Sequence, residues 1–167
     1  MEQLPFFGFS YNGHHECVYH LLNHKANVNL TKNIGASPLF VAARNGHHRI
    51  VKKLLKMGAN GNLCQQDMRS PLQTALLFHR KRCMKLLLKW NVYLITSDIH
   101  GCYPIHYAAM SGNIKAVRII TDHLISRKLY DPSIRDKHGN SALHTTLTHN
   151  TYDLANYLIS EKFNVNQ

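Results

Sequence analysis

The chain has 167 residues, of which 44% are hydrophobic, and this is enough for one compact domain or a short array of repeats. No apolar run is long enough to span a membrane, and Met1 to Phe9 lack the basic and apolar segments of a signal peptide, so we expect a cytoplasmic or nuclear protein. The 4 cysteines are too widely spaced for a CxxC zinc motif or a disulfide framework.

The formal charge of +11 is concentrated in one part of the chain. Between Cys17 and Ser97 there are 13 lysines and arginines against one acid, Asp67, a local charge of +12. The remainder is close to neutral. Any role for the charge must therefore belong to this stretch.

A period of 33 residues runs through the chain, and its clearest marker is a proline, at Pro5, Pro38, Pro71 and Pro104. Leucine pairs at 21–22, 54–55 and 87–88 follow the same period. The last unit comes five residues late, and we place the insertion around 124–132, where it lengthens a helix. We predict one domain with repeats of about 1–31, 32–64, 65–97, 98–134 and 135–167.

Each unit is predicted to form two helices. The first helix is expected to begin after an N-cap serine, at Ser37, Ser70 and Ser141, and to end at Gly46 or Gly112 in the left-handed conformation. In the second helix, Val51, Leu54 and Leu55 form one apolar stripe. A single unit cannot bury this stripe, so neighbouring units must stack.

The third and fourth units depart from the pattern. Met68 and His79 stand where other units have glycine, and Leu76 replaces an alanine. A positive φ at a residue other than glycine costs about 1 kcal/mol, so we expect the third unit to be weak or reshaped. Tyr103 replaces the N-cap serine of the fourth unit, which removes that cap.

The best-formed unit contains Gly35-Ala36-Ser37-Pro38-Leu39, then Ala42-Ala43, Gly46, Val51-Lys52-Lys53-Leu54-Leu55 and Gly58-Ala59-Asn60. These motifs resemble the ankyrin repeat, and the resemblance covers nearly the whole chain. It implies an all-α solenoid of about five helix–turn–helix repeats joined by β-hairpin-like turns, and it implies protein binding rather than catalysis.

In ankyrin-like architecture the hairpin tips and first helices line a concave face, where we place a partner-binding site. Leu77, Phe78, Ile99 and Met110 are the predicted apolar anchors, with Arg44 and Arg69 at the rim. Ile34, Asn45, His100 and Ser111 complete the predicted site. The alternative is that His79 shifts the end of the helix and turns Phe78 into the core.

Basic residues cluster on the predicted second helices of two units: Arg49, Lys52, Lys53, Lys56, Arg80, Lys81, Arg82, Lys85 and Lys89. Three interpretations stay open: a site for nucleic acid or an anionic membrane, a site for an acidic protein, or a solvated outer face. Nucleic acid is the least favoured, because no nucleic-acid-binding fold is evident and few aromatic residues are interspersed for base stacking.

The histidines are expected to be structural. His14-His15 and His47-His48 lie one repeat apart, roughly 10 Å, too far to share one metal ion, so we predict no metal site. His144 is expected to hydrogen-bond locally with Ser141. His106 faces Tyr103 and is expected to lack that partner.

Cys17, Ile50, Cys83 and Ala116 share one register position, which predicts a small apolar core. Cys102 is placed at a hairpin tip, as the potentially reactive thiol. Acids, nucleophiles and glycines show no catalytic or phosphate-binding arrangement, so we expect neither enzyme activity nor a cofactor.

We therefore expect a monomeric adaptor or inhibitor that binds a protein partner, which could be acidic. The alternatives are a regulatory or substrate-recognition segment of a larger assembly, such as a ubiquitin ligase adaptor, and an inhibitor of a transcription factor that resembles the I-kappa-B family. The start of the array is apolar, and the end has the residues of a turn into a further repeat. We therefore expect either a segment of a longer array or a first repeat that docks against another surface. The residues are Leu4, Phe6, Phe7 and Phe9 at the start and Phe163-Asn164-Val165-Asn166 at the end.

Overall fold

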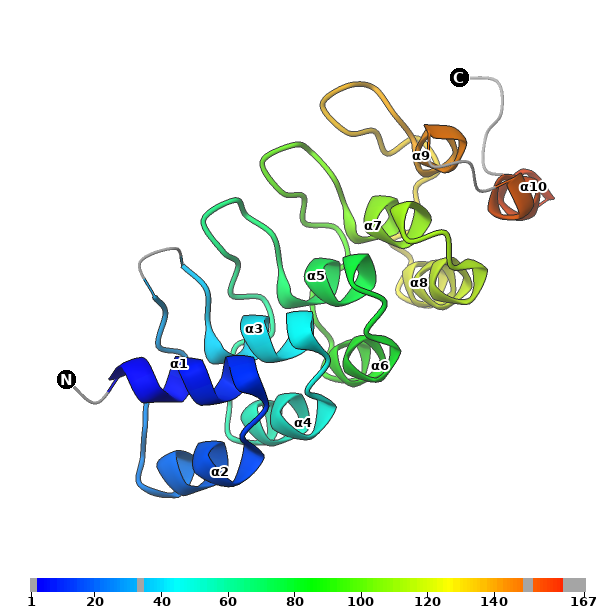
Figure 1. The fold of residues 1–167 in the computed structure, drawn as a ribbon. Helices are drawn as coiled ribbons and strands as arrows, with labels where there is room; N and C mark the ends of the chain where they lie inside the picture. The colour runs from blue at the N-terminus through cyan, green and yellow to red at the C-terminus, as the bar shows by residue number, and fades with distance from the viewer. Residues whose placement is uncertain (1–2, 33–34, 149–151, 161–167) are drawn as a thin grey trace. The chain divides into compact units, whose positions relative to one another are not determined.

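The computed structural model describes residues 3–32, 35–148 and 152–160, which contain ten α-helices and no strand (Figure 1). The chain divides into two compact units, Met1–Val92 and Tyr93–Gln167. The first unit contains α1 (Gln3–Asn12), α2 (His15–Asn23), α3 (Pro38–Asn45), α4 (His48–Lys56), α5 (Pro71–Leu77) and α6 (Lys81–Lys89). The second contains α7 (Pro104–Met110), α8 (Ile114–Ser126), α9 (Ala142–Thr148) and α10 (Tyr152–Ser160).

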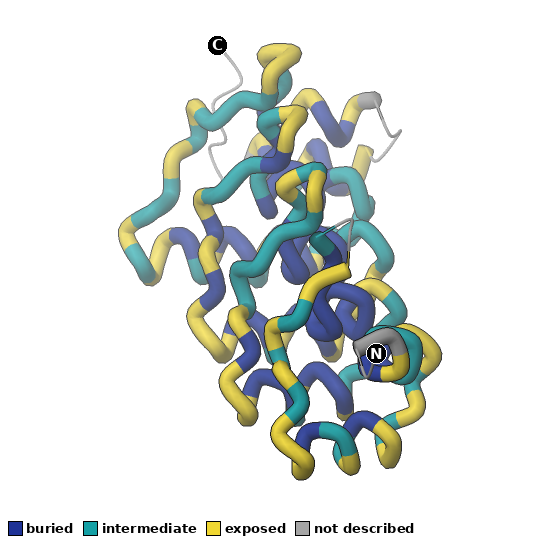
Figure 2. Tube along the Cα trace, turned by 90° about the vertical axis from the view of Figure 1, so that its left-hand side faces the viewer, coloured by how far each residue is buried: buried dark blue, intermediate teal, exposed yellow. Residues whose placement is uncertain are grey.

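Each unit has two layers of helices. In the first unit, α3 packs between α1 and α5 in one layer, while α4 packs between α2 and α6 in the other. In the second unit, α7 packs on α9 and α8 on α10. Figure 2 shows the buried residues gathered in the helices, and exposed residues both in the connections and along the helices. The all-α repeat architecture predicted from the period is confirmed.

The starts of the first helices follow the predicted caps. The Ser37 hydroxyl accepts a hydrogen bond of 3.1 Å from the Phe40 amide, and Pro38 occupies the first helical turn. At Ser70 the cap is reciprocal, because Gln73 Oε1 accepts from the Ser70 amide at 2.7 Å. Two backbone donors are thus satisfied at once. The three predicted N-cap serines are confirmed, since Ser141 Oγ also accepts from the His144 amide at 3.3 Å.

The connecting turns have one hydrogen-bond pattern in four places. The amide at 32, 65, 98 or 136 donates to the carbonyl oxygen four residues later, at 36, 69, 102 or 140. These turns follow the 33-residue period of the sequence, except that the last turn comes five residues late. The late unit has the predicted cause, because α8 has 13 residues whereas α4 and α6 have 9.

The irregular third repeat keeps the backbone of its neighbours. Gly46 ends α3 with a φ of 86°, and the substituted positions Met68 and His79 have φ values of 62° and 56°. The predicted strain is therefore present, and the backbone has not moved to avoid it. Tertiary packing of the repeat outweighs the local cost at both residues.

The signature histidine of the fourth repeat is bonded to the main chain. Tyr103 supplies no side-chain cap to α7, as predicted. His106 nevertheless has two partners: its Nδ1 accepts from the Tyr103 amide at 3.2 Å, and its Nε2 lies 3.0 Å from the Asn140 carbonyl oxygen. His106 has no serine hydroxyl beside it, as predicted, and the main chain of Tyr103 takes its place as the local partner. The local bond of His144 to Ser141 Oγ, 2.8 Å, is confirmed.

The predictions for two cysteines are wrong. Cys17 is exposed, although Ile50, Cys83 and Ala116 at the same register position are buried as expected. Its helix, α2, has a neighbouring second helix, α4, on one side alone within the described residues. Cys102 is buried, because its backbone amide donates to the carboxylate of Asp98, which is itself buried.

Candidate partner-binding surfaces

An aromatic side chain and a guanidinium meet on the first-helix layer of the first unit. Phe78 is the residue that ends α5, and with Leu77 it is half-buried. The exposed Arg44 of α3 places its guanidinium carbon 5.2 Å from the centre of the Phe78 ring. The alternative that Phe78 turns into the core is therefore wrong. His79 takes the left-handed conformation of the glycine it replaces, and Phe78 stays half-buried.

Two other predicted polar residues of this unit are held by the fold. The side-chain Nδ2 of Asn45 donates to the Tyr11 carbonyl oxygen at 2.7 Å, and this bond links the second repeat to the first. Arg69 pairs with Asp67 at 3.2 Å, and Asp67 Oδ1 also accepts from the Arg69 amide. Asn45 and Arg69 therefore stabilise the repeat array itself, independently of a partner.

The second unit carries the other predicted residues. Ile99 is 45% exposed at its hairpin, beside the exposed His100. Met110 and Ser111 end α7 and are half-buried, with Ser111 Oγ donating to the Ala108 carbonyl oxygen. Ile34 lies outside the described residues. The predicted anchors thus divide between two units, each with an apolar surface of its own.

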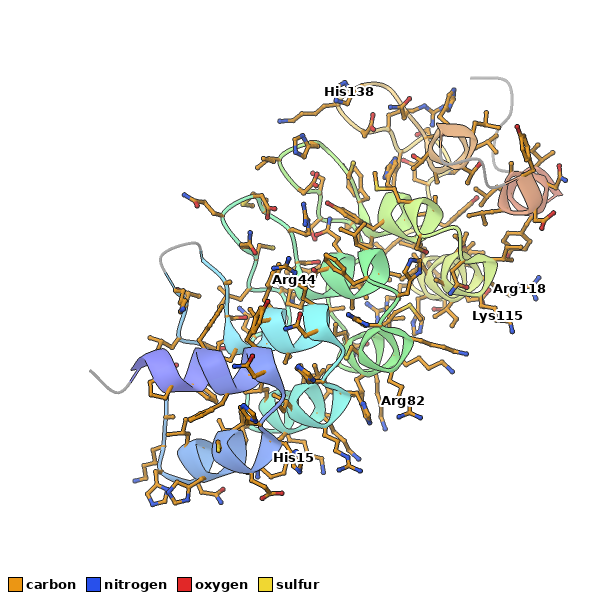
Figure 3. The ribbon with its side chains drawn as sticks, in the orientation of Figure 1. His15, Arg44, Arg82, Lys115, Arg118 and His138 are labelled. Carbon is orange, nitrogen blue, oxygen red and sulfur yellow. The ribbon has the colours of Figure 1, made fainter. Side chains whose placement is uncertain are left out.

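The predicted basic face lies on α4 and α6, which pack against each other in the second-helix layer. Its members are exposed except Lys53, which is half-buried with its Nζ 5.5 Å from the centre of the Tyr19 ring. The opposite side of each helix is buried, through Ile50, Leu54, Cys83 and Leu87 among others. Figure 3 shows Arg82 extending from α6 away from α5.

Arg80 differs from the rest of this set. Its Nε donates to the Arg44 carbonyl oxygen at 2.9 Å, so the side chain lies across the end of α3. His47, at the equivalent position one repeat earlier, makes the equivalent bond to the Tyr11 carbonyl oxygen at 2.8 Å. Arg80 is therefore a link between repeats, although it is exposed like most other members of the predicted basic face.

A family model described as ankyrin repeats (3 copies) matches residues 6–98 and 91–167. The chain belongs to the ankyrin-repeat family. No curated protein matches the sequence. Ankyrin repeats are in general protein–protein interaction modules and not enzymes, so the surfaces above are to be understood as surfaces for binding.

Two aspartates of the ankyrin array were missed by the sequence analysis. Asp98 is buried, and its carboxylate accepts from the amides of His100 and Cys102 and from the Tyr107 hydroxyl, the last at 2.6 Å. Asp136 accepts from the His138 and Asn140 amides, both at 2.8 Å. The signal was present as a repeated Asp-x-His-Gly at 98–101 and 136–139. Asp98 holds the hairpin turn that presents Ile99 and His100, and Asp136 holds the equivalent turn of the next repeat.

The pKa values of the ankyrin turn residues reflect these bonds. Burial raises the pKa of the Asp136 carboxyl, but the hydrogen bonds from Asn140 and His138 outweigh it, and the net pKa lies below the usual value. Burial lowers the pKa of His106, against the Asn140 bond and the Asp136 and Asp98 carboxylates, which raise it.

Within residues 3–32, 35–148 and 152–160 no group of three or more His, Cys, Asp or Glu side chains is arranged to hold a metal ion. Among the described helices, none has the length and apolar character needed to cross a bilayer.

Proposed function

We propose that this ankyrin-repeat protein is an adaptor or inhibitor that binds a protein partner through its first helices and hairpins. The observation that carries the proposal is the half-exposed pair Leu77 and Phe78 at the end of α5, with the Arg44 guanidinium over the Phe78 ring. Both are held in position by the rest of α5, which is buried from Pro71 to Leu76.

This arrangement has the properties of a binding hot spot. Aromatic and arginine side chains dominate the energetics of protein interfaces, because they bury large areas at a small cost in conformational entropy. The Phe78 ring is already oriented by Arg44, so little freedom is lost when a partner covers it. Arg44 keeps its remaining donors for a carboxylate or carbonyl of the partner.

The hairpin of the fourth repeat offers a second apolar contact. Ile99 is 45% exposed although its neighbours Asp98 and Cys102 are buried. An isoleucine at the tip of a turn held by a buried carboxylate is a rigid point of contact. We propose that Ile99 and Met110 form a further binding surface on the second unit, and that the protein acts as a monomer in the cytoplasm or nucleus.

The proposal is tested by quantitative affinity capture. Wild-type protein is compared with a Leu77→Ser/Phe78→Ser variant and with Trp90→Ser as the matched control. Trp90 is an exposed aromatic residue at the end of α6, as Phe78 is at the end of α5, but on the other helix layer. The captured protein is identified by mass spectrometry, and its Kd is measured with purified components.

We expect the double variant to weaken the Kd by at least about 100-fold, since two interface anchors each contribute on the order of 2 kcal/mol. The control should retain the wild-type affinity, and circular dichroism should show unchanged helix content in both variants. Equal affinity of wild type and double variant would disprove a site on α5.

A further inference from the structure

Three pairs of cations repeat across α4 and α6 with the 33-residue period. The pairs are Arg49 with Arg82, Lys52 with Lys85, and Lys56 with Lys89. All six side chains are exposed. We call these six residues the cation ladder.

The ladder has a regular geometry that follows from helix parameters. On each helix the cations stand at positions i, i+3 and i+7, which place them on one face with successive rises of about 4.5 and 6 Å. The two helices pack side by side, and packed helices lie roughly 8–10 Å apart. The result is two parallel rows of three positive charges.

The described part of the chain supplies no counter-charge for the ladder. None of its six side chains makes a hydrogen bond or ion pair with any residue the structure describes. The two described acids of this unit are occupied elsewhere, Glu16 with His15 at 3.1 Å and Asp67 with Arg69 at 3.2 Å. Like charges three and four residues apart destabilise a helix. The ladder therefore opposes folding, unlike Arg80, which links two repeats.

The ladder is confined to two of the repeats. The equivalent positions in the first repeat are Glu16, Tyr19 and Asn23, which provide no cation. In the fourth repeat Lys115 and Arg118 of α8 keep the pattern (Figure 3), but the acid Asp122 ends it. The Arg118 guanidinium lies 5.1 Å from the centre of the Tyr157 ring. If every outer helix face of the array were simply basic, the acids Glu16 and Asp122 would not stand at positions equivalent to those of the ladder.

We propose that the cation ladder is a docking site for an acidic helical segment of a partner protein. Carboxylates at i, i+3 or i+4, and i+7 of such a segment have the same rise per residue as the cations, so a helix laid along the two rows can pair with both. Charge complementarity selects the partner, and the matched helical spacing selects its conformation.

The composition of the ladder favours a peptide over nucleic acid. Four of its six cations are lysines, whereas arginine is the residue that binds phosphates through two parallel hydrogen bonds. Neither α4 nor α6 contains a Phe, Tyr or Trp on which a base could stack. Lysines on flexible stems suit the variable positions of carboxylates on a peptide.

The test uses a synthetic alanine-based helical peptide of about 20 residues with glutamates at i, i+3 and i+7. A peptide of the same composition with its glutamates spread around the helix, and a DNA duplex of about 20 base pairs, are measured beside it. Binding to the full chain is followed by fluorescence anisotropy at low and at physiological salt, because pairing between exposed charges weakens as salt rises.

Two variants with the same change in charge separate the ladder from net charge. Lys52→Glu/Lys56→Glu/Lys85→Glu removes half of the ladder. Lys25→Glu/Lys128→Glu/Lys137→Glu changes three exposed lysines outside it. We expect the first to weaken the Kd for the patterned peptide at least about tenfold and the second less than about threefold. Wild-type protein should bind the patterned peptide at least about fivefold more tightly than the rearranged one.

Equal weakening by both variants, or equal binding of both peptides, would overturn the proposal in favour of unspecific charge. Tighter binding of DNA that depends on the same three lysines would overturn it in favour of nucleic acid. A Lys52→Gln/Lys56→Gln/Lys85→Gln variant replaces the first if its circular dichroism is altered. The inference is independent of the proposed function, because Leu77→Ser/Phe78→Ser should leave the Kd for the peptide unchanged.

Discussion

The Nε of Arg80 donates a hydrogen bond of 2.9 Å to the carbonyl oxygen of Arg44, in the last turn of α3. The Arg80 side chain also lies against Gly46, the residue at which α3 ends. The first two repeats are joined in the same way, through His47 and the Tyr11 carbonyl oxygen. Carbonyl groups at the end of a helix have no partner inside that helix. A side chain of the following repeat satisfies them here, and this contributes to the stacking of repeats.

Replacing Arg80 by alanine should lower the free energy of unfolding by about 1 kcal/mol, because a hydrogen bond from a charged donor to a helix end is lost. Urea denaturation followed by circular dichroism measures the change. Arg82→Ala is the control, since Arg82 is an exposed residue of the same helix, and its stability should stay within about 0.5 kcal/mol of the wild type. Equal effects of the two substitutions would contradict the link.

Gly46 and Arg80 should be coupled. A Cβ at Gly46 would meet Arg80 Cδ at 2.9 Å, and the φ of 86° is itself unfavourable for alanine. Gly46→Ala should therefore cost about 1–2 kcal/mol in the wild type and less in an Arg80→Ala background, where the backbone cost of about 1 kcal/mol alone remains. Unfolding of the two single variants and the double variant completes the cycle, and strictly additive effects would contradict the contact.

Glycine at the two strained positions of the third repeat should stabilise the protein. Met68 and His79 have φ values of 62° and 56°, which glycine adopts without a steric cost. We expect Met68→Gly and His79→Gly each to raise the unfolding free energy by about 0.5–1 kcal/mol, the gain being reduced by the greater freedom of glycine in the unfolded chain. Met57→Gly is the control, because Met57 has a φ of −90°, and it should destabilise.

His106 should make stability depend on pH. Burial lowers the pKa of His106 in the folded chain below its ordinary value of 6.5, and its Nδ1 can accept from the Tyr103 amide only while unprotonated. Below pH 6.5 the unfolded chain therefore binds a proton more readily than the folded chain does. The stabilising contribution is complete above 6.5 and is lost as the pH falls from there through the folded pKa.

The measurement is urea unfolding of wild type and His106→Gln at several values between pH 7.5 and 5, a range of about one unit or more on each side of an ordinary histidine pKa. The variant should be less stable at the upper end and should lose less stability on acidification. His138→Gln changes an exposed histidine and should keep the wild-type slope. A wild-type slope in His106→Gln would show that other histidines are responsible.

The cysteines should differ in their reaction with thiol reagents. Cys17 is exposed and lines an open hollow of about 560 Å³ with Tyr19 and His20, whereas Cys83 is buried, which raises its pKa to about 11. Native protein should be labelled at Cys17 within minutes and at Cys83 and Cys102 only on unfolding. Peptide mass spectrometry identifies the sites, and early labelling of Cys102 would contradict its burial.

Much of the fold follows from the sequence because its determinants are local. The N-cap serines Ser37 and Ser70, the prolines after them and the apolar stripes of the second helices each act within a few residues, and they recur with one period. The backbone at Met68 and His79 follows the same rule, since both take the conformation of the glycines they replace.

Tertiary structure decided what residues at equivalent positions do. Cys17 and Cys83 share a register position, yet Cys17 is exposed on α2, the first of the second helices, and Cys83 is buried where α6 packs against α4 and α5. Lys81 and Arg80 are neighbours in a basic run, yet only Arg80 reaches a free carbonyl oxygen of the preceding repeat. The period determines the position of each residue within its repeat. Contacts with the neighbouring repeat determine whether its side chain is buried, hydrogen-bonded or accessible to a partner.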